Sequence, residues 1–100
     1  MLPFKENIIQ ENSKFVLVER KFSSNLSSKE LTWHRDKEDR EVILKKGTGW
    51  YIQFDNELPT LMSVNNVYKI PSYTWHRIIN KNKTNLTIEV KKYKWIQNKF

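Results

Sequence analysis

The chain has 100 residues, of which 13% are aromatic and none is cysteine, and its formal net charge is +7 at pH 7. This length suits a single domain with one core, and the lack of cysteine excludes disulfide scaffolds, thiolate zinc sites and cysteine nucleophiles. No apolar run approaches the roughly 20 residues that span a bilayer, and residues 1–10 lack the apolar stretch of a signal peptide. We therefore expect a cytoplasmic protein without a membrane partner.

The first half of the chain predicts β-structure, because β-branched and aromatic residues are frequent and alanine, the best helix former, is absent. Residues 1–12 give no clear signal. Strands are predicted at residues 14–22, 31–34, 41–46 and 50–54. In the last of these, Trp50, Ile52 and Phe54 alternate with Tyr51 and Gln53, which is the period of a half-buried strand.

The second half continues the same pattern of short apolar runs between turn residues. Further strands are predicted at residues 67–70, 74–80 and 86–93, and Pro59 restricts the segment around it to an edge or loop-bounded strand. The tail, residues 94–100, fits either a short helix or a frayed end. The whole chain thus predicts an all-β fold, a single small barrel of about eight strands over residues 1–100, with less than about a tenth helix.

One stretch of the second half resembles the second sequence motif of the cupins, a family of small β-barrels. That motif runs Gly, five residues, Pro-x-Gly, two residues, His, three residues, Asn. Here Asn65 stands at the first Gly position, Pro71 at the Pro, Tyr73 at the second Gly, His76 at the His and Asn80 at the final Asn. The resemblance implies a small, jelly-roll-like cupin barrel.

The first cupin motif is matched less fully. It runs Gly, five residues, His-x-His, three or four residues, Glu, six residues, Gly. His34 fits its first His, Asp36 replaces the second, Glu41 fits the Glu position, and Gly47 comes one residue early. The two motifs together cover residues 31–80. Within the family, the chain resembles short, uncharacterised single-domain cupins of bacteriophage genomes, which would place it in the host cytoplasm.

The candidate site residues are His34, Asp36, Glu41 and His76. His34 and Asp36 are two apart, so on a strand both side chains point to one face. The resemblance makes His76 a metal ligand that arrives from a neighbouring wall, and Glu41 could complete the set. Two His with one or two carboxylates suit one divalent transition metal, Fe(II), Mn(II), Ni(II) or Zn(II), and no other cofactor is indicated.

A purely structural role for these residues stays open as the alternative. Each His lies between a Trp and an Arg, in the triplets Trp33-His34-Arg35 and Trp75-His76-Arg77, which indicates paired positions in the barrel. Trp and His also pack together without a metal, and Asp36 could instead form an ion pair with Arg35, Arg40 or Arg77. Ala substitutions with metal analysis would separate the two roles.

Two functions compete. The first is a cupin-like protein with a polar pocket that acts on or senses a small molecule, with apolar walls from Trp33, Trp50, Tyr68 and Trp75. The second is a non-catalytic dimeric binding module whose basic C-terminal region, residues 81–100 with six lysines and one acid, contacts nucleic acid or an acidic partner. The Lys- and Asn-rich composition that an AT-rich genome produces explains this charge without selection for binding. We favour that explanation, and therefore the first function. In both cases we expect a symmetric homodimer formed around residues 15–18.

Overall fold

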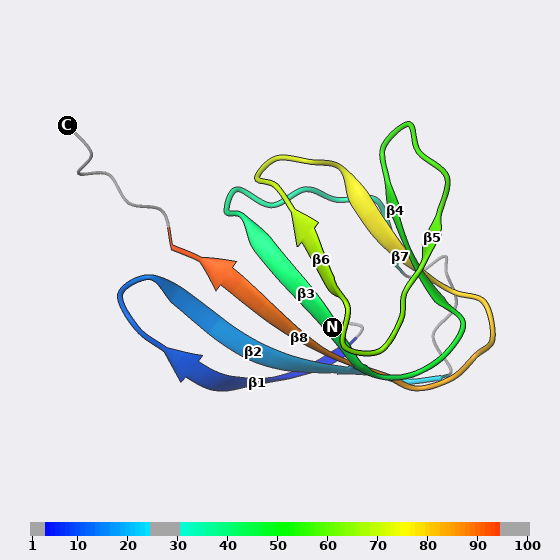
Figure 1. The fold of residues 1–100 in the computed structure, drawn as a ribbon, viewed down its shortest axis with the longest axis horizontal. Helices are drawn as coiled ribbons and strands as arrows, with labels where there is room; N and C mark the ends of the chain where they lie inside the picture. The colour runs from blue at the N-terminus through cyan, green and yellow to red at the C-terminus, as the bar shows by residue number, and fades with distance from the viewer. Residues whose placement is uncertain (1–3, 25–30, 95–100) are drawn as a thin grey trace.

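The computed structural model describes residues 4–24 and 31–94, which form eight strands in two sheets (Figure 1). The larger sheet has the order β1 (Phe4–Glu11), β2 (Phe15–Phe22), β8 (Leu86–Tyr93), β3 (Arg40–Lys46) and β6 (Val67–Ile70). The smaller sheet has the order β5 (Thr60–Leu61), β4 (Trp50–Phe54) and β7 (His76–Asn80). All strand pairs are antiparallel. The prediction of an all-β fold with about eight strands is confirmed.

The core lies between the two sheets, and the period-two alternation of the strands supplies it. Val18 of β2, Leu44 of β3, Ile52 of β4 and Val90 of β8 are each at most 1% exposed. Trp50 is fully buried, and its indole Nε1 donates a hydrogen bond of 3.0 Å to the Thr84 carbonyl oxygen. The largest aromatic group of the core therefore has its polar atom satisfied, as a buried indole requires.

Three turns match glycine positions of the cupin motifs. Asn65 and Tyr73 stand where the second motif has Gly, and both take left-handed backbone angles, with φ of 68° for Asn65 and 59° for Tyr73. Gly47 has a φ of 133°, and a Cβ there would lie 2.8 Å from the Asn85 carbonyl oxygen. Because L-residues rarely adopt such angles, the backbone explains why the motif favours glycine at these places.

The structure differs from the sequence-based expectation at three places. Residues 4–11, which gave no signal, form β1 against β2. The predicted strand 31–34 is reduced to a single bridge between His34 and His76, and β7 begins at His76 rather than at residue 74. Most of the predicted tail, residues 95–100, lies outside the described residues. No helix in the described part of the chain has the length and hydropathy to cross a membrane.

Candidate metal centre

A two-residue antiparallel bridge positions both histidines. The backbone N–H of His34 donates to the carbonyl of His76 at 3.0 Å, and the N–H of His76 donates back to His34 at 2.9 Å. Side chains directly opposite in such a bridge lie on the same face, so the two imidazoles meet, with ring centroids 4.3 Å apart. The sequence-based expectation that the two triplets occupy paired positions agrees with this bridge.

The flanking residues of the two triplets form cross-strand pairs on the opposite face. The guanidinium of Arg77 lies 4.8 Å from the ring centroid of Trp33, and that of Arg35 lies 5.1 Å from the ring of Trp75. Antiparallel pairing about the bridge places each Trp opposite the Arg of the other triplet. The repeated Trp-His-Arg sequence therefore directs two imidazoles to the interior and covers their backbone with two cation–π pairs.

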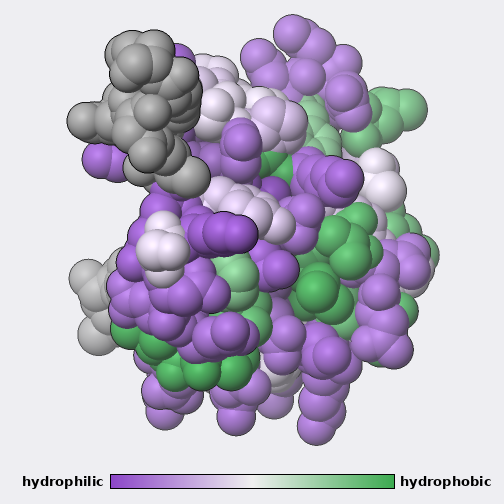
Figure 2. Space-filling view, turned by 60° about the vertical axis from the view of Figure 1, so that its left-hand side comes forward, coloured by the Kyte–Doolittle hydropathy of each residue, from purple (hydrophilic) through white to green (hydrophobic). Residues whose placement is uncertain are grey.

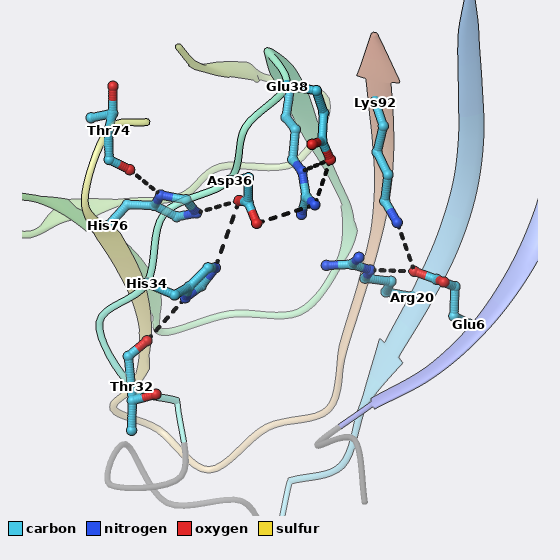
Figure 3. Close-up of polar contacts among 10 residues, drawn as sticks. Glu6, Arg20, Thr32, His34, Asp36, Glu38, Thr74, His76 and Lys92 are labelled. Carbon is cyan, nitrogen blue, oxygen red and sulfur yellow. Dashed lines mark hydrogen bonds and ion pairs between the residues drawn. The ribbon is translucent and has the colours of Figure 1, made fainter. Parts of the chain in front are cut away.

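Asp36 completes a group of three side chains that point toward one another (Figure 3). Its Oδ2 lies 3.5 Å from Nε2 of His76 and 3.9 Å from Nε2 of His34. One ligand atom of each residue lies within 4.8 Å of the others. The side chain of His76 is 5% exposed and that of Asp36 16%, whereas that of His34 is 51% exposed. The group is thus buried on the side of His76 and Asp36 and open to solvent on the side of His34.

The hydrogen bonds of the two rings fix which nitrogen carries the proton. Nδ1 of His34 lies 3.0 Å from the carbonyl oxygen of Thr32, and Nδ1 of His76 lies 2.8 Å from that of Thr74. A carbonyl can only accept, so each Nδ1 donates, and in the neutral ring the lone pair is then on Nε2. Both lone pairs face Oδ2 of Asp36. Imidazole Nε2 with Nδ1 bonded to a carbonyl is the usual state of a metal-ligating histidine.

The electrostatics of the pocket favour a neutral His76. Burial has the largest effect and lowers the pKa of His76 below its usual value, against the hydrogen bond with Thr74, which raises it. Of the lesser effects, the charges of His34 and Arg40 lower this pKa and that of Asp36 raises it. His76 therefore holds no second proton near pH 7. This leaves Oδ2 of Asp36 buried without a hydrogen-bond donor among the described residues, although buried polar atoms are usually satisfied.

Arg40 orients the Asp36 carboxylate. Its Nη2 lies 3.2 Å from Oδ1 of Asp36, which turns Oδ2 toward the imidazoles. Glu38 accepts hydrogen bonds from Nε and Nη2 of the same guanidinium at 3.0 and 2.7 Å. Burial raises the pKa of Glu38, but the hydrogen bond and charge of Arg40 outweigh it and hold that pKa below its usual value. Of the three ion pairs proposed for Asp36 from the sequence, the one with Arg40 is present.

Glu41 is not part of this group. Arg40 and Val42, its neighbours along β3, both line the interior cavity, so the alternation of the strand places Glu41 on the other face. There it lies beside Tyr93, in a separate surface depression. The alternation of β3 carries this signal, because Glu41 is out of phase with the buried Val42 and Leu44.

A cavity of about 370 Å³ adjoins the three residues. His34, Asp36 and His76 form part of its lining, and much of the rest is apolar, including Phe4, Phe22 and Ile88. The prediction of an aromatic cavity wall from four residues is wrong. None of them lines this cavity: Trp33, Trp50, Tyr68 and Trp75. Trp33 and Trp75 are partly exposed on the outside, because each directly precedes an inward-pointing histidine of the bridge and points the other way.

Two cationic residues of the cavity wall, Arg20 and Arg40, were not among the candidate residues. Arg20 follows Val18 and precedes Phe22 at alternate positions of β2, and Arg40 has the same relation to Val42 in β3. A period-two reading of each strand places both arginines on the inward face. A charged residue at a position where the alternation of a strand predicts an inward-facing apolar residue is therefore the sequence signal for both arginines.

Three lysines of the basic C-terminal region have partners within the fold. Nζ of Lys92 lies 3.6 Å from Glu6, and Nζ of Lys94 lies 3.0 Å from Glu11. Lys91 lies over the ring of Phe15 at 4.6 Å. These contacts give the lysines a role in the sheet, and Trp95, the aromatic residue of the predicted nucleic-acid-binding run, lies outside the described residues.

The fold and this group of side chains define a small two-sheet β-barrel with a His-Asp-His cluster at its interior cavity. Solved structures with the same architecture include cupins. A cupin domain from Bordetella pertussis superposes with a TM-score of 0.69 at 17% identity, covering 92% of this chain and 94% of that chain. A cupin-2 domain protein from Shewanella frigidimarina gives a TM-score of 0.70 at 19% identity, covering 90% and 80%.

An RmlC-like cupin from Methanocaldococcus jannaschii, with a double-stranded β-helix fold, gives a TM-score of 0.70 at 16% identity, covering 90% of this chain and 79% of that chain. The chain therefore has the fold of a small cupin. No protein-family model and no curated protein sequence matches it. At these identities the likeness establishes the fold, and any activity has to be argued from the residues of the site.

Proposed function

We propose that this protein binds one divalent transition metal through His34, Asp36 and His76 and holds a small molecule in the adjoining cavity. One observation carries the proposal. Two imidazole Nε2 lone pairs and a carboxylate oxygen with no hydrogen-bond donor converge on one point. Three such electron pairs repel one another unless a cation lies between them.

The chemistry of the ligands narrows the choice of metal. Two imidazoles and one carboxylate suit Fe(II), Mn(II), Ni(II) or Zn(II), and three protein ligands leave positions open for water or a bound molecule. The partly exposed His34 side and the cavity are where such a molecule would lie. A metal held there would act as a Lewis acid toward it.

Metal analysis of untagged protein tests the proposal. We expect wild-type protein to bind close to one equivalent of added Mn(II), Fe(II), Ni(II) or Zn(II), and His34→Ala, His76→Ala and Asp36→Ala each to lose most of it, because two remaining protein ligands rarely hold a divalent ion. Glu41→Ala is the matched control. It removes a carboxylate from the same segment but from the opposite face, and should retain the metal.

Circular dichroism of every variant shows that metal loss does not come from unfolding. Equal, weak binding in wild type and in all three ligand variants would refute the metal site and leave only the fold. Metal loss in Glu41→Ala together with metal retention in Asp36→Ala would show that Glu41, and not Asp36, is the carboxylate ligand.

We further propose that the protein acts as a homodimer in the cytoplasm, and that it derives from a bacteriophage. These three points rest on the sequence, through its size, its composition and its resemblance to short phage cupins. The metal and the cavity do not depend on them.

A further inference from the structure

Arg20 occupies an unusual place for a charged residue. It lies in the inward-facing row of β2, between the buried Val18 and Phe22, and its side chain is only 14% exposed. Its guanidinium borders the same cavity as the His-Asp-His cluster. Removing a guanidinium from water costs free energy unless its N–H donors find acceptors.

Among the described residues, hydrogen-bond acceptors meet only one edge of this guanidinium. Nε donates to Oε1 of Glu6 at 2.6 Å, and the plane lies 4.3 Å from the ring centroid of Phe4. The same Oε1 of Glu6 also forms an ion pair with Lys92, whose Nζ lies 3.6 Å from it. Within the described residues the two Nη atoms of Arg20 have no hydrogen-bond partner, and Figure 3 shows the end of the guanidinium directed away from Glu6, toward the side of Asp36.

The charges around the cavity balance only without a metal. Three cations, Arg20, Arg40 and Lys92, are paired with three carboxylates, those of Glu6, Glu38 and Asp36. A divalent ion on the His-Asp-His cluster would add two positive charges in a partly desolvated space. An anionic ligand then lowers the electrostatic energy of the loaded site, and a neutral one does not.

We propose that the cavity takes a small carboxylate-bearing molecule whose carboxylate binds the two free Nη groups of Arg20. The planar fork of a guanidinium matches a carboxylate with two parallel hydrogen bonds. The apolar wall around Phe22 and Ile88 would cover the body of the molecule, and the volume of about 370 Å³ suits a compound up to about the size of a monosaccharide acid. This inference takes the cavity as the ligand site, as the proposed function does, but the pairing with Arg20 does not require the metal.

The test compares acids with their own neutral amides. Lactate, benzoate and glucuronate, each paired with its amide, are titrated into the full chain with and without one equivalent of Zn(II), using calorimetry or ligand-observed NMR. We expect at least one acid to bind tenfold or more tightly than its amide. Arg20→Gln should reduce that preference to within about threefold, and Arg20→Lys, which keeps the charge but not the fork, should give an intermediate value.

Arg35→Gln is the matched control, because it removes the same charge from the outer face. It should leave the preference for the acid unchanged. The proposal is overturned if no acid is preferred over its amide, if the preference survives in Arg20→Gln, or if inorganic phosphate binds more tightly than every acid. Zn(II) content measured on the same samples separates this result from failure of the metal site, because Arg20→Gln should bind Zn(II) like wild type.

Discussion

At the scale of single residues, the ability of the site to bind a metal depends on which imidazole nitrogens carry a proton. Thr32 and Thr74 accept from the two Nδ1 atoms, and Arg40 turns one carboxylate oxygen of Asp36 inward. The two contacts with backbone carbonyls cannot be read from the spacing of the motif, whereas the pair of Asp36 with Arg40 was one of three that the sequence left open. They nevertheless decide that the Nε2 atoms present lone pairs rather than protons.

The lowered pKa of His76 predicts how the metal-free protein responds to acid. The folded state disfavours the protonated ring, whereas the unfolded chain takes up the proton near the ordinary value of about 6.5. The unfolded state therefore binds more protons below that pH, and the free energy of unfolding should fall as the pH decreases from about 6.5. The slope for one proton is at most about 1.4 kcal/mol per pH unit.

Urea denaturation between pH 7.5 and 5.5, with a chelator present, measures this slope. His76→Gln, which cannot titrate, should show a smaller loss of stability over the same range. Equal slopes in the two proteins would show that His76 is not the group responsible.

At the scale of the elements, the bridge between His34 and His76 joins the segment before β3 to the edge of the smaller sheet. Only two reciprocal backbone hydrogen bonds form it. The cation–π pairs on its outer face add to these bonds. They explain why the same three residue types occur twice in the chain.

A double-mutant cycle measures one of these pairs. With Trp33→Leu and Arg77→Gln, we expect a coupling of about 0.5–1 kcal/mol in the free energy of unfolding, which is typical of a cation–π pair at an exposed site. The control cycle combines Trp33→Leu with Arg35→Gln, whose guanidinium lies over Trp75 instead. It should give a clearly smaller coupling. Comparable couplings in both cycles would contradict the pairing described here.

Most of the elements could be predicted from the sequence, and the exceptions have physical reasons. Strands β2, β3, β4, β6 and β8 follow from apolar alternation and turn residues. β1 could not be predicted, because it is mostly exposed after Phe4 and is held by pairing with β2 rather than by burial. Residue types and motif order predicted the three residues that come together as candidate metal ligands: His34, Asp36 and His76. Glu41 lies on the other face because it alternates with the buried Val42 and Leu44 of β3, a signal that the motif spacing does not use.

At the scale of the whole molecule, several large hydrophobic side chains of the described residues are exposed. Figure 2 shows one face on which hydrophobic residues form separate patches among hydrophilic ones. β1 is an edge of the larger sheet, and its Ile8 and Ile9 are 65% and 50% exposed. β2, where the dimer was expected from the sequence, has both of its edges paired, with β1 and β8.

We therefore propose that the predicted homodimer forms through the outer edge of β1, because β2 has no edge left to pair. An exposed strand edge with β-branched residues readily pairs with a second copy. Sedimentation velocity at micromolar concentration should show a dimer for wild type and a shift to monomer for Ile9→Lys. A wild-type monomer would contradict the prediction, and so would a dimer unaffected by Ile9→Lys together with Ile8→Lys.

The position of the three proposed ligands along the chain has a consequence for folding. His34 and Asp36 precede β3, whereas His76 begins β7, so the chain must close a loop containing β3, β4, β5 and β6 before the third ligand arrives. Closing that loop costs entropy, and the unfolded chain has no preformed site. A metal would bind almost only to the native state. Each tenfold rise in its free concentration above Kd would then add about 1.4 kcal/mol to stability, so metal supply would set how much of the protein is folded.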